Sequence, residues 1–285
     1  MGDDKNNTEA GLISKAIDGV LGEGAAGVLI TLIELPERGS RDLRIGAKLL
    51  ARESGETVGT LGAAELDEAV ARHAHGFLSA REDAKSIKLE EFAADLSEFQ
   101  GLCLLFERIE AEPRLVIAGA GHVGASLARL AFLVGYRVTL IDDRAEFVSR
   151  ELFPSPDEQA IDLVVAEDWG ESMREAVATG RVVSVAIVTR GHKQDEDCLR
   201  AVISSDPFYV GMIGSKRRTN IVLEKLREEG TCEEQLKKVR APIGLDLGAV
   251  SPEEVALAIL AEIVAERRGG SGAPLSKWRR NQRST

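Results

Sequence analysis

The sequence predicts an α/β protein in which a small α+β domain precedes a doubly wound parallel sheet. From Pro113 onward, short β-branched runs alternate strictly with amphipathic helical patterns, as expected when helices connect parallel strands. Before Pro113, strand-like runs surround helical patterns without this strict alternation. We therefore expect domains at 1–112 and 113–268, followed by a basic tail at 269–285 whose composition predicts disorder.

The N-terminal domain is expected to contain helices and short strands. Apolar residues at helical spacing end at Gly22 in the first helix and near Gly76 in the second. The strands are apolar or β-branched runs bounded by polar turn residues. In chain order the expected elements are a helix at 8–21, strands at 27–35, 45–50 and 56–61, a helix at 63–75, and strands at 86–92 and 102–109.

A glycine motif opens the second domain. An apolar strand at 115–118 runs into Gly119, Gly121 and Gly124, which have G-x-G-x-x-G spacing and lead into an amphipathic helix. Gly119 would permit the tight strand-to-helix turn, Gly121 would let a pyrophosphate approach the backbone, and Gly124 would let the helix pack on the strand. The phosphate would lie on free N–H groups at the positive end of the helix dipole.

A second strand, at 137–141, ends at Asp142. This acid lies about 20 residues beyond the glycines, where a ribose-binding carboxylate is expected in dinucleotide-binding proteins. Strand, glycines, helix, second strand and acid thus agree, and together they predict a Rossmann-like fold.

The remaining elements continue the alternation. The run at 182–188 is β-branched throughout, as in a central parallel strand. Pro252 stands at the favoured first helical position after Ser251. The expected strands are at 163–165, 182–188 and 208–213, and the expected helices are at 171–178, 194–203, 216–229 and 252–267.

Composition excludes several classes of protein. The chain has 285 residues and a net charge of -11, which argues against general nucleic-acid binding and against an anionic membrane surface. Its three cysteines form no C-x-x-C pair, so a zinc site or a disulfide framework is not expected, and a reducing cytoplasm fits. No apolar run is long enough for a membrane span, and the N-terminus is too acidic for a signal peptide.

Ligands of doubly wound sheets bind at the carboxyl ends of the strands, and three further segments fall there. In the first, Thr189 could donate to a ligand oxygen, Arg190 could bind an anion, and His192 titrates near neutral pH. An equally good interpretation is that Thr189 caps the strand and His192 caps the next helix.

The second segment, 211–218, favours an anion site. After Gly214, Ser215 is the expected helix N-cap, and Lys216, Arg217 and Arg218 follow at once. Cations in the first turn oppose the helix dipole, so a bound anion would remove a local conflict. The alternative is a solvated basic surface.

The third segment, 241–248, has glycines and a proline that specify a shaped loop around Asp246, which we expect to be buried. Packing alone explains this loop as well as function does. No catalytic residue or metal ligand is predicted elsewhere: His73 and His75 point to different sides of a helix, and Cys103 and Cys198 fit core positions.

Taken together, the motifs of the second domain closely resemble the xanthine dehydrogenase accessory-factor family over about residues 114–268. The motifs that carry the resemblance are Gly119-Ala-Gly-His-Val-Gly124, Asp142-Asp-Arg144, Thr189-Arg-Gly-His192, Gly211-Met-Ile-Gly-Ser-Lys216, Ala241-Pro-Ile-Gly-Leu-Asp246 and Ser251-Pro-Glu-Glu-Val. The N-terminal half departs from the family pattern: Ala63 and Ala64 stand where turn glycines are expected, and Cys103 is displaced within its motif.

The resemblance implies a homodimeric maturation chaperone that binds a molybdenum–pterin cofactor and delivers it to a molybdenum hydroxylase apoenzyme, with a sulfurtransferase as a candidate further partner. The cysteine usage noted above predicts that this chaperone is cytoplasmic. Two alternatives stay open: an NAD- or NADP-dependent oxidoreductase, and a divergent, non-catalytic dimeric binding protein. Asp142 favours NAD, whereas Arg144 keeps NADP open. The residues expected to bind cofactor are Gly119, Gly121, His122, Gly124, Asp142, Arg144, Thr189, His192, Gly214, Ser215, Lys216, Arg217 and Asp246.

Overall fold

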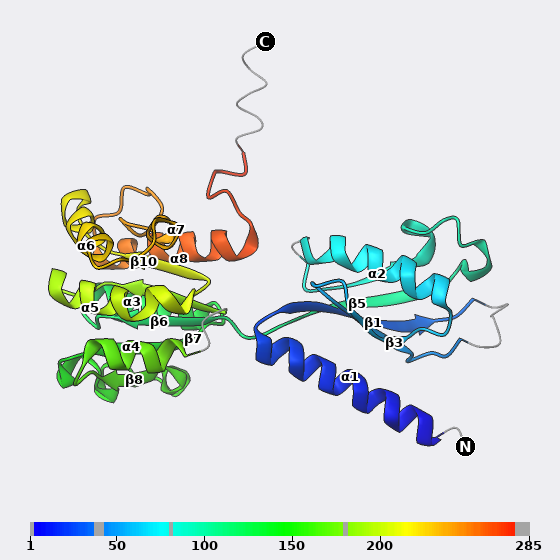
Figure 1. Ribbon diagram of the computed structural model, residues 1–285. Helices are drawn as coiled ribbons and strands as arrows, with labels where there is room; N and C mark the ends of the chain where they lie inside the picture. Colours follow the sequence, from blue (N-terminus) through cyan, green and yellow to red (C-terminus); the bar gives the residue numbers. More distant parts are fainter. Residues whose placement is uncertain (1–2, 37–42, 80–81, 179–181, 277–285) are drawn as a thin grey trace, which may run out of the picture. The chain divides into compact units, whose positions relative to one another are not determined.

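The structure, a computed structural model, describes residues 3–36, 43–79, 82–178 and 182–276 (Figure 1). The chain divides into two compact units, Met1–Ala111 and Glu112–Thr285. Most of the predicted disordered tail, 277–285, lies outside the described residues. The predicted fold class is confirmed, because an antiparallel α+β unit precedes a unit built on a parallel sheet.

Five described strands of the N-terminal unit form an antiparallel sheet in the order β3-β2-β1-β5-β4. Helices α1 and α2 lie on opposite faces of this sheet (Figure 1). Strand β1 serves both faces, since Val28 and Ile30 pack toward α2 while Leu29 packs toward α1. The elements are α1 (Asp3–Glu23), β1 (Ala26–Glu34), β2 (Lys48–Arg52), β3 (Thr57–Thr60), α2 (Ala64–Ser79), β4 (Ala84–Lys88) and β5 (Cys103–Glu110).

The prediction of a strand at 86–92 is wrong for the second half of this range. Strand β4 ends at Lys88, and the chain turns into two short 3-10 helices, Leu89–Glu91 and Ser97–Phe99. The Glu91 carboxylate accepts a hydrogen bond from the Lys88 N–H at 3.1 Å, and the fully buried Leu89 anchors the turn in the core. A local cap thus ends the strand although the apolar pattern continues.

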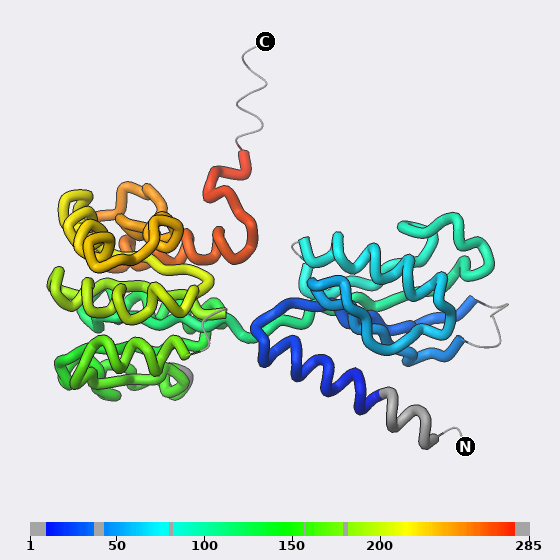
Figure 2. The backbone as a smooth tube through the Cα atoms, in the orientation of Figure 1, coloured from blue at the N-terminus to red at the C-terminus, as the bar shows by residue number. Residues whose placement is uncertain are grey.

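The C-terminal unit has a parallel sheet in the order β10-β9-β6-β7-β8 among its described residues. Its strands are β6 (Arg114–Ala118), β7 (Arg137–Asp142), β8 (Asp162–Val165), β9 (Val183–Ile187) and β10 (Tyr209–Met212). Its helices are α3 (His122–Leu133), α4 (Trp169–Val177), α5 (His192–Val202), α6 (Lys216–Glu228), α7 (Glu233–Lys238) and α8 (Pro252–Arg268). The path from the green strands to the red end of α8 can be followed in Figure 2.

Strand β6 divides the core of this unit into two layers. Leu115 and Ile117 pack with α3 and α8 on one face, whereas Val116 and Ala118 pack with α4, α5, α6 and α7 on the other. After β6 the chain adds β7 and β8 on one side of the sheet, and after β9 it adds β10 on the other side. The strand order therefore reverses between the adjacent strands β6 and β9. A switch point of this kind is where doubly wound sheets bind ligands.

The predicted cap of the last helix is confirmed. Ser251 Oγ accepts from the Glu254 N–H at 3.2 Å, the Glu254 carboxylate accepts from the Ser251 N–H at 3.0 Å, and Pro252 stands at the first helical position. Helix α7 was not predicted, because it buries only Leu236 and so has no apolar periodicity. None of the helices in the described ranges has the length and apolarity to cross a membrane.

Candidate functional site

The glycine loop between β6 and α3 has the geometry that its spacing predicted. Gly119 has φ 107°, and a Cβ there would lie 2.6 Å from the Val188 carbonyl oxygen. A Cβ on Gly124 would lie 1.8 Å from the Gly119 carbonyl oxygen, so only glycine lets the helix begin here. Beside Gly121 there is open space within 4 Å of a built Cβ. The turn and packing roles are therefore confirmed, and the phosphate contact at Gly121 stays a prediction.

Helix α3 begins without a side-chain cap. Gly121 is the N-cap residue and His122, which is exposed, is the first helical residue. The first turn contains no acidic residue that would complement the helix dipole. The amides of this turn are thus left for solvent or for a bound anion.

Asp142, the predicted ribose-binding acid, is 2% exposed, and both oxygens of its carboxylate accept hydrogen bonds from groups of its own chain. Its carboxylate accepts from the Ala120 N–H at 2.7 Å, from the Arg144 N–H at 3.1 Å, and from the Arg144 guanidinium at 2.8 and 3.0 Å. Burial by itself raises the pKa of Asp142, but the hydrogen bonds from Arg144 and Ala120 outweigh it, and the pKa lies below its usual value. In this conformation Asp142 orders the glycine loop, and its contact with a ligand stays a prediction.

Arg144, also predicted as a ligand residue, is neutralised by the same contact. Its guanidinium lies 3.8 Å from the centre of the Phe147 ring, which holds it against the loop after β7. The neighbouring Asp143 pairs with Arg190 at 3.1 Å. One Asp–Arg pair therefore orders the glycine loop, and a second joins the loops that follow β7 and β9.

A third cluster joins the β9 loop to helix α6, and sequence reasoning missed its central residue. Asp195 is fully buried in the first turn of α5. Its carboxylate accepts a hydrogen bond from Thr189 Oγ1 at 2.5 Å and forms an ion pair with Arg218. Burial raises the pKa of Asp195, although the hydrogen bond from Thr189 and the charge of Arg218 oppose this.

A signal for Asp195 was present in the sequence. The buried face of α5 carries Cys198, Leu199 and Val202, and Asp195 stands one turn before them at the same helical spacing. An acid on an apolar helix face is buried only where a partner meets it. The partners, Thr189 and Arg218, are remote in sequence, so the spacing alone could not identify them.

The predicted N-cap of α6 is confirmed, and the anion site predicted beside it stays a prediction. Ser215 Oγ caps the helix by accepting from the Arg218 N–H at 3.3 Å, and Gly214 has φ 151°. No acidic residue lies in this turn. Lys216 and Arg217 are exposed, and neither forms an ion pair with any residue that the structure describes. Lys193, at the start of α5, is likewise exposed and unpaired within the described chain, and His192 beside it is exposed.

The expectation that Asp246 is buried is wrong. Asp246 is exposed, and Ile243 is the residue that fixes its loop by packing against Gly211. Glu262 supports the loop from α8, since its carboxylate accepts from the Gly244 N–H at 2.8 Å and from the Tyr209 hydroxyl at 2.5 Å. The loop is therefore shaped by packing, and Asp246 is not drawn into the Asp–Arg contacts of the other loops.

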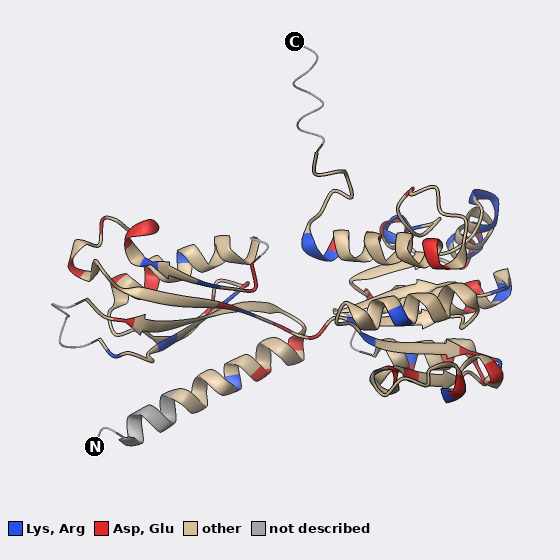
Figure 3. Cartoon of the chain, turned by 180° about the vertical axis from the view of Figure 1, so that it is seen from behind, with Lys and Arg blue, Asp and Glu red and all other residues tan. Residues whose placement is uncertain are grey.

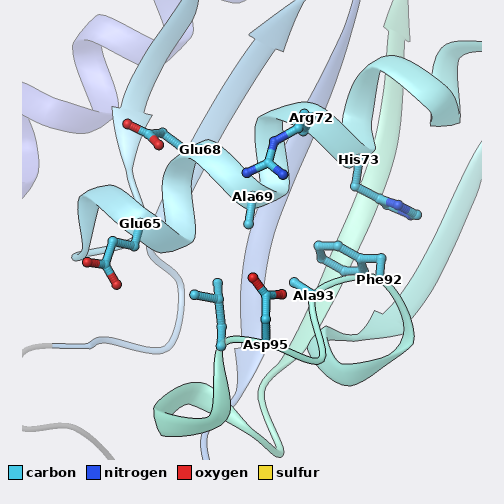
Figure 4. A pocket seen from close by; sticks show the side chains of 9 residues that line it. Glu65, Glu68, Ala69, Arg72, His73, Phe92, Ala93 and Asp95 are labelled. Carbon is cyan, nitrogen blue, oxygen red and sulfur yellow. The ribbon is translucent and has the colours of Figure 1, made fainter.

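A separate hollow lies in the N-terminal unit, between α2 and the segment 92–96 (Figure 4). It has a volume of about 420 Å³, with Ala69 and Ala93 among the lining residues. His73 stacks on Phe92 with ring centres 4.1 Å apart, and burial lowers the pKa of this imidazole. No group of three or more His, Cys, Asp or Glu side chains in the described parts of the chain is arranged to hold a metal ion.

Fold and site define a class of protein in which an α+β unit precedes a nucleotide-type α/β domain. At the strand ends of this domain, α3 begins without a side-chain cap, and α6 begins with cations that pair with no acid among the described residues. Residues 115–263 match the domain described as the XdhC Rossmann domain, and residues 20–92 match the XdhC and CoxI family. The chain therefore belongs to the XdhC family, and the resemblance to xanthine dehydrogenase accessory factors is confirmed.

Three curated relatives extend this family assignment. The chain is 31% identical to the uncharacterized protein YqeB of Escherichia coli (strain K12), over 82% of this chain and 43% of that protein. It is 29% identical to a protein of Bacillus subtilis (strain 168) described as a probable subunit of xanthine dehydrogenase, over 58% and 46% of the two chains. It is 28% identical to the molybdenum cofactor insertion chaperone PaoD of Escherichia coli (strain K12), over 54% and 40%. The alignments thus span less than half of each relative.

Proposed function

We propose that this protein takes part in the maturation of a molybdenum hydroxylase by holding a phosphate-bearing molybdenum–pterin cofactor at the carboxyl edge of its parallel sheet. Membership of the XdhC family supports this role, as does similarity to a molybdenum cofactor insertion chaperone. The observation that carries the proposal is that two helix starts follow strands at the carboxyl edge of the parallel sheet: α3, after β6, begins without a side-chain cap, and α6, after β10, begins with cations that no described acid neutralises.

The residues at this edge fit a phosphate group. The α3 amides beyond Gly121 and the open space next to that glycine suit close approach of an anion to the backbone. Lys216 and Arg217 supply positive charge, and the anion would relieve their conflict with the α6 dipole. The cofactor supplies the redox chemistry of the hydroxylase that receives it, so the chaperone's own residues need only bind and orient it.

Binding of inorganic pyrophosphate and of the molybdenum–pterin cofactor tests the proposal. Replacing both cations, K216A/R217A, should weaken binding about 10- to 100-fold, because charge-assisted hydrogen bonds contribute roughly 1.5–3 kcal/mol each before partial compensation. The matched control K15A/K237A removes the same charge from exposed positions on α1 and α7. Equal affinity in all three proteins, or no activation of any apo-hydroxylase by cofactor-loaded wild type, contradicts the proposal.

An NAD(P)-dependent oxidoreductase is the competing function. It is favoured by the fold, but the carboxylate expected to bind the ribose is already occupied by Ala120 and Arg144. Titration with NADH and NADPH, followed by nicotinamide fluorescence, separates the two hypotheses. Tight binding accompanied by turnover of an aldehyde or a hydroxy acid would replace the chaperone by the oxidoreductase.

The partners follow from the proposed role. A hydroxylase apoenzyme would receive the cofactor, and a sulfurtransferase would act before delivery if the cofactor is sulfurated while it is bound. We retain a homodimer in the cytoplasm as part of the proposal. Co-purification with a hydroxylase, and the mass of the protein in solution, test these assignments.

A further inference from the structure

The cluster of Thr189, Asp195 and Arg218 is a largely buried polar contact at the carboxyl edge of the parallel sheet. Asp195 is fully buried, Thr189 is 6% exposed, and the Nε atom of Arg218 is buried without a hydrogen-bond partner among the described residues. Both carboxylate oxygens of Asp195 are engaged, one by each partner. A charged carboxylate can be buried only where hydrogen bonds and ion pairs of this kind offset the free-energy cost of its desolvation.

The cluster connects two segments that follow neighbouring strands. Thr189 lies two residues beyond the end of β9 and holds the following turn, since its hydroxyl oxygen also accepts from the Gly191 N–H at 3.3 Å. Arg218 belongs to the first turn of α6, directly after Lys216 and Arg217. Asp195 therefore connects the β9 loop to the helix end that presents Lys216 and Arg217.

The cations at this edge fall into two groups, those paired with an aspartate and those without a described acidic partner. Arg144, Arg190 and Arg218 are each paired with an aspartate, namely Asp142, Asp143 and Asp195 respectively. Lys216 and Arg217, in contrast, pair with no acid in the described ranges. Arginines that order the loops are thus distinct from the cations that remain for a ligand.

We propose that Asp195 is a positioning residue of the anion site: it holds the β9 loop and the first turn of α6 in one arrangement and takes up the charge of Arg218, so that Lys216 and Arg217 bind the anion. This inference rests on the proposed function, since it assigns roles within the same site. Asp195 itself does not contact the ligand.

The test replaces the buried pair without leaving an isolated charge. In D195N/R218M the net charge is unchanged, and the methionine keeps most of the arginine stem, so long-range electrostatics and gross packing are preserved. We expect the variant to fold, with a cooperative urea transition, but to bind inorganic pyrophosphate about tenfold more weakly than wild type in calorimetry. The control E196Q/R200M removes the neighbouring ion pair of the same helix, together with the pairs of these two residues to Asp197, Lys225 and Glu229, and should bind as wild type does.

A conservative exchange distinguishes positioning from general stability. T189S keeps the hydroxyl that donates to Asp195 and should retain affinity, whereas T189V removes it and should lose affinity severalfold while remaining folded. Wild-type affinity in D195N/R218M and T189V, with reduced affinity in K216A/R217A, would overturn this inference and leave the proposed function standing. Failure of the wild-type protein to bind pyrophosphate would overturn both.

Discussion

At the scale of single residues, Gly124 is a position where even one added methyl group has no room. A Cβ at Gly124 would lie 1.8 Å from the carbonyl oxygen of Gly119, and backbone atoms cannot move away as a flexible side chain can. We expect Gly124→Ala to lower the free energy of unfolding by about 3 kcal/mol or more, at or beyond the upper end of usual overpacking costs. Urea unfolding measures this loss.

Gly121 is the matched control in the same loop. Its φ is -64° and the space beside it is open, so Gly121→Ala should change stability by no more than about 1 kcal/mol. The added methyl group would instead occupy the space assigned to the phosphate and weaken pyrophosphate binding. A large loss of stability in Gly121→Ala, or none in Gly124→Ala, would contradict the geometry of the loop.

Asp142 gives a prediction with a defined dependence on pH. In Asp142→Asn the amide would face the Arg144 guanidinium and the Ala120 N–H, and breaking such a buried pair costs about 3–5 kcal/mol. Because the folded-state pKa of Asp142 lies below its usual value, this stabilisation is complete above the unfolded-state value of about 4. It is lost as the pH falls through the lower folded-state value.

Unfolding by urea at pH 7 and at progressively lower pH tests this prediction. The difference in unfolding free energy between wild type and Asp142→Asn should be largest at pH 7 and should shrink in acid. A difference that does not depend on pH would mean that the charge of Asp142 is not what stabilises the glycine loop.

At the scale of secondary-structure elements, the cations in the first turn of α6 are expected to lower the stability of the helix while they increase its affinity for an anion. Its first turn has cations and no acid, so the double variant K216E/R217E should stabilise the helix by about 0.3–1 kcal/mol per residue. The same change should abolish pyrophosphate binding, because it reverses the charge offered to the anion. Thermal unfolding and calorimetry measure the two effects, and K15E/K237E reproduces the change in net charge elsewhere. Parallel losses of stability and binding would show that these cations are structural.

Element boundaries followed from the sequence where a local signal was strong. The capping box at Ser251 and the hydroxyl cap at Ser215 define helix starts by their own chemistry. Strand β4 ends before the predicted residue because the Glu91 carboxylate caps the following turn. Helix α7 was not predicted because its single buried leucine makes no periodic pattern. In both cases a short element depends on contacts that hydrophobic spacing does not report.

At the scale of the whole molecule, each unit has cores of its own. The clusters around Ile30 and Val20 contain only residues of the N-terminal unit, and those around Ile117 and Val185 only residues of the C-terminal unit. We therefore expect two calorimetric transitions rather than one. Gly124→Ala should lower the midpoint of only one transition, and pyrophosphate should raise the midpoint of that same transition. A single transition shifted as a whole would contradict independent units.

Acidic and basic residues are interspersed over the molecule (Figure 3), so net charge does not locate the site. The sequence by itself determined the fold class, the glycine loop and the family, because glycine spacing, strand–helix alternation and helix caps are local features. Only the tertiary structure decided that Asp142 and Arg144 bind each other, that Asp246 faces solvent, and that Asp195 joins Thr189 to Arg218. Pairing depends on which strand ends become neighbours, and that order is fixed by the packing of the whole sheet.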